Sequence, residues 1–123
     1  MSEALKVNQT LETLGFSNNS LIGDDGLAAI AGVLGNCKLA AVDLQDCSIT
    51  LTGAKFLATS LQTIKRKFGV FLDGNDITVE GARLILQSAV ENKAAIGVWV
   101  GDDYKDDQKV AEMLSVLEGK RGE

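Results

Sequence analysis

The stretch of the chain that most resembles a chemical site is GVWVGDDYKDD, residues 97–107. It holds the only tryptophan and the only tyrosine of the sequence, Trp99 and Tyr104, together with four aspartates. Paired carboxylates could bind a divalent cation, because Ca²⁺ and Mg²⁺ prefer oxygen ligands. The alternative is that Asp106 or Asp107 caps a helix, where an acid stabilises the positive end of the helix dipole. We favour the helix cap over the metal site.

Residues that would support catalysis are otherwise scarce. The chain has no histidine, which excludes a Ser–His or Cys–His nucleophile and any histidine-bearing metal site. It also lacks a GxxxxGK[ST] phosphate loop and a CxxC pair. DGND at 73–76 is no calcium loop, because the twelfth position from Asp73 is Leu84 rather than Glu. We therefore expect no enzyme, no metal and no cofactor; a metal-dependent enzyme that uses the acidic turn 102–107 is the remote alternative.

Composition narrows the class of partner. A chain of 123 residues has the length of a single domain. Its net charge of −5 argues against nucleic acid, whose binders cluster Lys and Arg, and we expect the run Lys65-Arg66-Lys67 to be a solvated loop. No apolar run approaches the roughly 20 residues that cross a membrane. Two cysteines, Cys37 and Cys47, fit a reducing compartment. We expect a cytoplasmic protein with neither nucleic acid nor membrane as partner.

An internal repeat organises the chain and decides where its side chains point. Four segments align, starting near residues 11, 39, 67 and 95: LETLGFSNNSL, LAAVDLQDCSI, KFGVFLDGNDI and AIGVWVGDDYK. An apolar pair recurs every 28 residues, at Leu14/Phe16, Val42/Leu44, Val70/Leu72 and Val98/Val100. Gly26, Gly53 and Gly81 then open apolar stretches of helical spacing, with one extra residue between Leu21 and Gly26. The residue pattern of each unit predicts a short strand, a turn and a helix of about twelve residues.

This pattern resembles the leucine-rich repeat, LxxLxLxx(N/C)xL followed by glycine, and its ribonuclease-inhibitor type of about 28 residues. The resemblance covers Ala4 to about Leu117. It implies an α/β solenoid, a short horseshoe of about four repeats, with a parallel β-sheet on the concave face and helices on the convex face. It also implies that the residue three places after the second apolar one turns inward and bonds the loop backbone: Asn19, Cys47, Asn75 and Asp103. Asp103 cannot donate hydrogen bonds, so we expect a looser fourth turn.

The two ends of the array differ. We treat residues 1–123 as a single domain, in which 1–10 are the end of a preceding helix or a partial cap and 119–123 are a flexible tail. The last helix should turn Glu112, Ser115 and Glu118 away from its apolar face, as a capping repeat requires. A solenoid that begins within a unit leaves an unpaired strand at 13–17. We expect a larger parent chain or self-association to cover that edge, unless residues 1–8 are a sufficient cap.

Alternation along the strands identifies a candidate binding surface on the concave face. Phe71 and Trp99 should stand side by side on neighbouring strands, about 4.8 Å apart, above Gly69 and Gly97. Aromatic anchors dominate many interfaces, and nearby acids suit an Arg or Lys of a partner. The predicted partner-binding residues are Phe71, Trp99, Asp43, Asp73, Gln45, Asp46 and Asp102. The alternative is that the two rings only cover each other, or that a C-terminal segment covers both.

The sequence therefore predicts a protein–protein interaction module or assembly subunit that binds a partner on its concave face, where the acids favour a basic partner. ALKVNQTLETL, residues 4–14, together with the short repeat array also resembles tropomodulin-like domains that bind and cap actin filaments. The same phrase resembles the C-terminal ligand-sensing repeats of larger sensor proteins. These two families are the alternative assignments.

Overall fold

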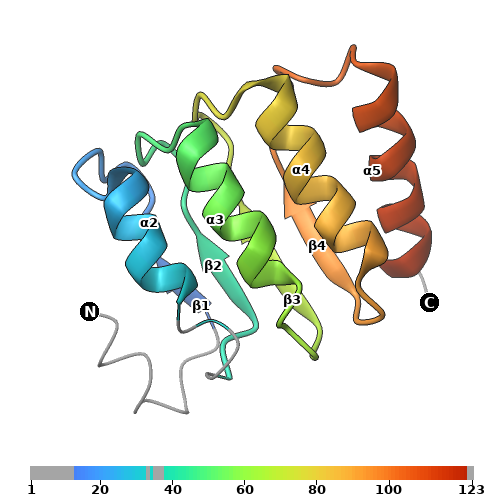
Figure 1. Ribbon diagram of the computed structural model, residues 1–123, viewed down its shortest axis with the longest axis horizontal. Coiled ribbons are helices and arrows are strands. Elements are labelled where there is room, and N and C mark those ends of the chain that lie inside the picture. Colours follow the sequence, from blue (N-terminus) through green and yellow to red (C-terminus); the bar gives the residue numbers. More distant parts are fainter. Residues whose placement is uncertain (1–12, 33, 35–37, 122–123) are drawn as a thin grey trace.

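Strands and helices alternate along the chain. The computed structural model describes residues 13–32, 34 and 38–121. The order of elements is β1 (Thr13–Gly15), α2 (Gly23–Ala31), β2 (Ala41–Asp43), α3 (Leu51–Leu61), β3 (Phe68–Phe71), α4 (Thr78–Glu91), β4 (Ile96–Trp99) and α5 (Gln108–Arg121). The strands form one parallel sheet in the order β1-β2-β3-β4, and α2, α3 and α4 lie side by side against it (Figure 1). The predicted four-unit α/β solenoid is confirmed.

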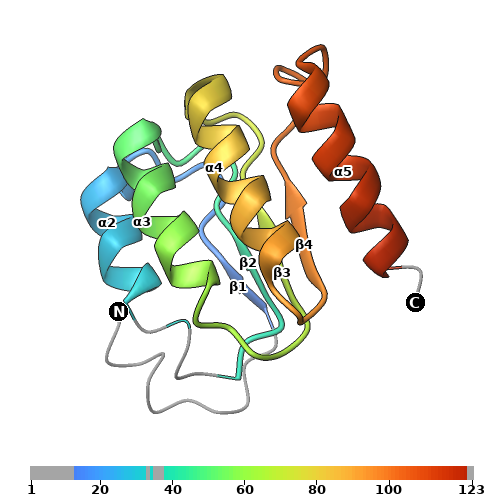
Figure 2. The same cartoon turned by 45° about the vertical axis from the view of Figure 1, so that its right-hand side comes forward.

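The repeat period sets the register of the sheet. Leu14 pairs with Val42, Val42 with Val70, and Val70 with Val98 across neighbouring strands. Successive side chains of a strand point to opposite faces, so this register stacks the apolar positions against the helix layer. Figure 2 shows the helices as a layer beside the strands. Val42, Val70 and Val98 are buried, whereas Leu14, on the edge strand, is only partly buried.

The core lies between the two layers. The apolar stretches that Gly26, Gly53 and Gly81 open are buried at the positions of helical spacing: Leu27, Ile30, Leu34, Ala54, Leu57, Leu61, Ala82, Ile85 and Ala89. Each fully buried leucine or isoleucine of this layer contributes about 1.5–3 kcal/mol. Within the described residues, no helix has the length and apolar character needed to span a bilayer.

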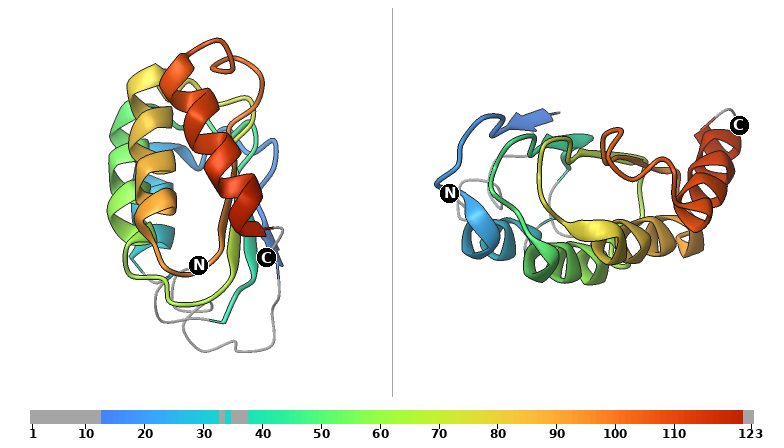
Figure 3. Two further views of the ribbon diagram at one scale, coloured as in Figure 1. Left: turned by 90° about the vertical axis from the view of Figure 1, so that its right-hand side faces the viewer. Right: turned by 90° about the horizontal axis from the view of Figure 1, so that it is seen from above.

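Helix α5 closes the C-terminal end of the two layers. It leaves the row of helices and crosses the end of the solenoid between the helix layer and the sheet (Figure 3). Val110, Met113 and Leu117 are buried there, while Glu112, Ser115 and Glu118 are exposed, as predicted for a capping repeat. One boundary was wrong: residues 119–121, expected in a flexible tail, belong to α5. Residues 1–10 and 122–123 lie outside the described residues.

Asn75 joins two units through its buried side chain. Its Oδ1 accepts hydrogen bonds from the amides of Cys47 (2.9 Å) and Ile49 (3.0 Å). Its Nδ2 donates to the carbonyls of Leu44 (2.7 Å) and Leu72 (2.9 Å). Cys47 does the same one unit earlier with a thiol, which donates to the carbonyl of Phe16 at 3.0 Å. The residue in this position therefore satisfies backbone groups of the preceding unit that no strand pairing reaches.

At both ends of the array the residue in this position does not turn inward. The inward position implied for Asn19 was wrong, whereas the exposure of Asp103 fits the looser fourth turn that was expected. Asn19 is exposed, and its side-chain Oδ1 accepts a 3.3 Å hydrogen bond from the amide of Leu21. Asp103 is exposed too, because a carboxylate cannot donate to a buried carbonyl. Tyr104 takes its place: its buried phenol donates to the carbonyl of Asn75 at 3.1 Å. Burial raises the pKa of this phenol, and the backbones of Ile77 and Thr78 partly offset the rise.

The first unit contains its extra residue earlier than the sequence suggested. Leu21, aligned with Ile49 and Ile77, is 94% exposed. Ile22 fills the apolar position instead, and its Cγ2 lies 3.0 Å from where a Cβ on Gly26 would be. The insertion thus precedes Ile22. Ile22 and Gly26 are therefore four residues apart, which is the same separation as between Ile49 and Gly53 in the second unit.

The basic run before β3 is not uniformly solvated, contrary to expectation. Lys65 and Lys67 are exposed, but Arg66 is half-buried. Its guanidinium donates to the carbonyls of Leu39 (2.8 Å) and Leu34 (3.0 Å). Leu34 and Leu39 lie in the connection between α2 and β2. A donor from the next unit therefore satisfies backbone carbonyls that this connection leaves without a helix or strand partner.

Candidate functional site

Phe71 and Trp99 form a stacked pair on the concave face, which is the face of the sheet turned away from α2, α3 and α4. They are register partners on β3 and β4, with ring centroids 4.4 Å apart and planes inclined by 13°. The Trp99 ring also lies over Gly69, where a Cβ would be only 3.2 Å from Trp99 Cζ3. Trp99 is 37% exposed and Phe71 is half-buried. The rings partly cover each other, as the alternative supposed, and still present an aromatic surface, here called the aromatic platform.

Asp43 and Gln45 border the platform on the β2 side. Asp43 is the register partner of Phe71. Its Oδ1 accepts hydrogen bonds from the backbone amide and from the side-chain Nε2 of Gln45, both at 3.1 Å. The amide of Gln45 therefore holds the carboxylate of Asp43 in place beside the ring. Both side chains are partly exposed and carry one net negative charge.

Asp73 follows Phe71 by two residues on the same face. Its Oδ1 is buried and has no hydrogen-bond partner among the described residues. The side chain lies against Gly101, where a Cβ would be 3.8 Å from Asp73 Cγ. An unsatisfied buried acceptor costs about 1–3 kcal/mol, more when charged. Asp73 thus keeps one buried acceptor that no described residue satisfies.

Asp46 and Asp102 lie at the rim of the concave face, in the loops after β2 and β4, and both are exposed. Asp46 has a left-handed backbone (φ 54°), and its carboxylate sits over Gly74 of the next unit. A Cβ at Gly74 would overlap that carboxylate, so glycine is required there for space as well as for its own φ of 79°. Of the predicted site residues, five lie on or beside the platform and these two lie at its rim.

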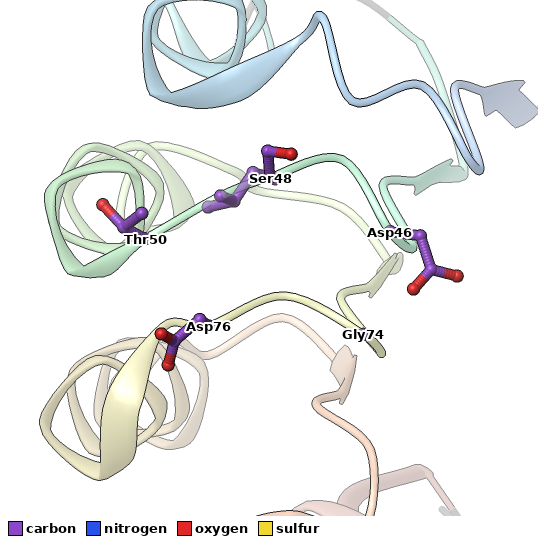
Figure 4. Close-up of a pocket in the computed structure, with 6 residues that line it drawn as sticks. Asp46, Ser48, Thr50, Gly74 and Asp76 are labelled. Carbon is purple, nitrogen blue, oxygen red and sulfur yellow. The ribbon is translucent and has the colours of Figure 1, made fainter.

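A shallow open depression beside Asp46 does not form a ligand site. It has a volume of about 380 Å³ and is lined by Asp46, Ser48, Ile49, Thr50, Gly74 and Asp76. Figure 4 shows the side chains of Asp46, Ser48 and Asp76 pointing in different directions. The Thr50 hydroxyl is already engaged, because it donates to Asp24 at 2.5 Å. The polar groups therefore do not converge on one point.

One acid of the turn 102–107, Asp107, has structural partners. Asp107 Oδ1 accepts from the amide of Val110 at 2.9 Å, which caps α5 as predicted. Asp107 also pairs with the Arg83 guanidinium of α4, and this hydrogen bond is the main cause of its lowered pKa. In the part of the chain that the structure describes, no three His, Cys, Asp or Glu side chains are grouped to hold a metal ion. The geometry gives no support to a metal-dependent reaction at this turn.

Comparison with known sequences decides the family. Residues 7–31 and 35–58 match the family described as Leucine Rich repeat. Mouse ribonuclease inhibitor is 36% identical over 84 residues, which is 67% of this chain and 18% of the inhibitor. This chain is a leucine-rich-repeat protein of the ribonuclease-inhibitor type. Human NACHT, LRR and PYD domains-containing protein 5 is 29% identical over 90 residues, 72% of the leucine-rich-repeat chain and 7% of that protein. The chain thus spans less than a fifth of either relative.

Two solved structures share the fold of this leucine-rich-repeat protein. Leiomodin-1 actin-binding site 2 superposes with a TM-score of 0.75 at 16% identity, over 98% of this chain and 89% of the other. The C-terminal domain of tropomodulin from Caenorhabditis elegans gives a TM-score of 0.72 at 12% identity, over 98% and 93%. Identities this low establish the architecture alone.

Sequence reasoning missed Tyr104, Ile22 and Arg66 as structural residues of the leucine-rich-repeat protein. The signal for Tyr104 was its position beside Asp103, where a donor was needed. The signal for Ile22 was its distance from Gly26. No repeat spacing indicated the role of Arg66, because that role depends on the path of the loop before β3. The assignment of Phe71, Trp99 and the surrounding acids as partner-binding residues stays a prediction.

Proposed function

We propose that this leucine-rich-repeat domain is a protein-interaction module whose aromatic platform anchors a partner on the concave face. The observation that carries the proposal is the stacked, partly exposed pair of Phe71 and Trp99 at the centre of that face. Aromatic side chains held rigidly by their surroundings contribute strongly to binding, because little conformational entropy is lost. Asp43 and Asp73 beside the rings favour a partner with basic side chains.

Retention of binding proteins on immobilised variants tests this proposal. The double variant Phe71→Ala/Trp99→Ala should retain at least about tenfold less partner than the wild type, since each truncated anchor costs about 2 kcal/mol. The matched control is Phe56→Ala on α3, which removes a 48% exposed aromatic ring from the helix layer. Equal retention by the double variant and the wild type, with both folded by circular dichroism, would reject the concave platform.

Actin is a second candidate partner, and the fold match to leiomodin-1 actin-binding site 2 favours it. Co-sedimentation with actin filaments and pointed-end elongation assays test it. If actin is the partner, the wild type and Phe56→Ala should bind, whereas the platform double variant should not. An absence of both binding and any effect on elongation would remove actin and leave the platform open to another protein.

A second contact is proposed at the edge strand β1, which pairs only with β2 among the described strands. A larger parent chain or a second copy would cover this edge. Sedimentation velocity over a range of concentrations tests self-association, and a single species at all concentrations would count against a second copy. The sensor-repeat alternative, a cytoplasmic location and the lack of enzymatic activity stay predictions.

A further inference from the structure

The concave face carries opposite charges at the two ends of β3. Lys67 directly precedes β3, Gly69 and Phe71 lie within it, and Asp73 follows its end by two residues. All four positions share one parity along the chain. Lys67 is exposed, Phe71 belongs to the aromatic platform, and Asp73 is partly exposed. The segment from Lys67 to Asp73 spans about 20 Å if it is extended throughout. A cation and an anion thus flank the platform, one directly before β3 and one after its end.

The neighbouring loops extend this charge separation. The acids at the carboxyl ends of the strands are together called the acidic rim here: Asp46 and Asp102 in the loops, and Asp43 and Asp73 beside the platform. The rim at the amino ends, here the basic rim, comprises the exposed Lys38, Lys65, Lys67 and Lys93. Lys65 and Lys93 line one open depression of about 560 Å³, in which Glu91 is the only acid.

Helix dipoles explain only part of this arrangement. They favour acids in the first turns of helices, such as Asp24, Asp25 and Glu80, which lie at the same end of the molecule as the acidic rim. Asp43 belongs to a strand, and Asp73 keeps a buried oxygen without a hydrogen-bond partner. Neither is stabilised by a helix terminus. Their placement beside the platform therefore calls for a partner's charge.

We propose that the concave face binds an extended partner segment whose charges are segregated along its length, which deepens and rests on the proposed function. Basic side chains of the segment meet the acidic rim, an apolar side chain packs on the aromatic platform, and acidic side chains meet the basic rim. A seven-residue extended segment spans about 20–25 Å, which matches the separation of Lys67 and Asp73. A uniformly basic segment would meet the lysines at one end, and a uniformly acidic one would meet the aspartates at the other.

Four synthetic peptides test this inference, each with blocked termini and a fluorophore for anisotropy. RRSLSEE is charge-segregated, and RESLSRE has the same composition with its charges mixed. RRSLSRR is uniformly basic, and EESLSEE is uniformly acidic. We expect RRSLSEE to bind about fivefold or more tighter than each of the others at low salt, because exposed ion pairs contribute up to about 1 kcal/mol each. The advantage should shrink as the salt concentration rises.

Charge reversal at the basic rim provides the sharper test. Lys65→Glu/Lys67→Glu should invert the preference, so that RRSLSRR binds more tightly than RRSLSEE. Neutralisation of the acidic rim by Asp73→Asn/Asp102→Asn should reduce the advantage of RRSLSEE over EESLSEE to less than about twofold. Lys55→Glu, on the exposed surface of α3, is the matched control and should leave all preferences unchanged. Circular dichroism checks that each variant is folded.

Three peptide-binding outcomes would overturn the inference. They are equal binding of RRSLSEE and RESLSRE, tightest binding of a uniformly charged peptide by the wild type, and an unchanged preference in the folded Lys65→Glu/Lys67→Glu variant. Concentration-dependent dimers that charge reversal abolishes would point to a second copy as the occupant and likewise overturn it. The proposed function can survive any of these, because it fails only if the platform double variant keeps its partner.

Discussion

Asn75 shows how much a single side chain can contribute to this fold. Its amide makes four hydrogen bonds to backbone groups of two successive units. Asn75→Ala should lower the free energy of unfolding by about 3–5 kcal/mol, because buried amides and carbonyls lose their partners. Asn19→Ala, at the equivalent but exposed position, should change it by less than about 0.5 kcal/mol. Urea unfolding measures both, and equal effects would contradict the roles assigned to these residues.

For Asp73 we predict the opposite effect of substitution on stability, because its buried oxygen has no hydrogen-bond partner among the described residues. Asp73→Asn removes the charge while keeping the shape. The free energy of unfolding should stay the same or rise by about 1 kcal/mol. Thermal and urea unfolding of the isolated protein provide the measurement. A loss of more than about 1 kcal/mol would mean that the carboxylate stabilises the fold.

At the scale of elements, the start of α4 is strained. Thr78 has a φ of 65°, whereas Thr50, the equivalent residue before α3, is extended with a φ of −115°. A left-handed backbone costs a β-branched residue about 1–2 kcal/mol. The local compensation is a weak one, a 3.3 Å hydrogen bond from the amide of Gly81 to the Thr78 hydroxyl.

Relief of this strain is testable. Thr78→Gly should raise the free energy of unfolding by about 0.5–1 kcal/mol, because glycine adopts positive φ without a steric penalty. The control is Thr50→Gly, which should lower stability, since it adds backbone freedom where the conformation is already favourable and removes a hydroxyl that donates to Asp24. Changes of the same sign in both variants would contradict the strain.

The elements were predictable wherever the repeat alone determined them. The strands, the helices and the buried positions follow from a 28-residue spacing, because stacked units must present the same apolar face to a common core. The stacking of the repeat units also made it predictable that Phe71 and Trp99 are register partners on neighbouring strands. The inclination of the two rings was not predictable, because it depends on the space above Gly69. Side chains that reach into the preceding unit, such as Arg66 and Tyr104, escaped prediction because several neighbouring positions can supply such a donor.

At the scale of the whole molecule, two buried acids couple stability to high pH. Burial raises the pKa of the Cys47 thiol and of the Tyr104 phenol, so both stay protonated in the folded protein at a pH where the unfolded chain releases the proton. Their contribution is complete below the unfolded pKa values, about 8.5 for cysteine and 10 for tyrosine, and is lost as pH rises through the folded values.

The free energy of unfolding should therefore fall as pH rises above about 8.5, and more steeply above about 10. Tyr104→Phe should be less stable at neutral pH, because the hydrogen bond to Asn75 is lost, and should lose less further stability above pH 10. Urea unfolding at a series of pH values provides the measurement. A wild-type profile that is flat through this range would contradict the burial of both groups.

The central claim is that the concave face binds a protein through the aromatic platform, and Trp99 reports on it directly as the only tryptophan. Acrylamide quenching of Trp99 fluorescence should show an accessible ring in the isolated protein, in keeping with its 37% exposure. Addition of the captured partner should lower the quenching constant severalfold in the wild type and in Phe56→Ala alike. A ring fully shielded in the isolated protein, or quenching unchanged at saturating partner, would contradict the account.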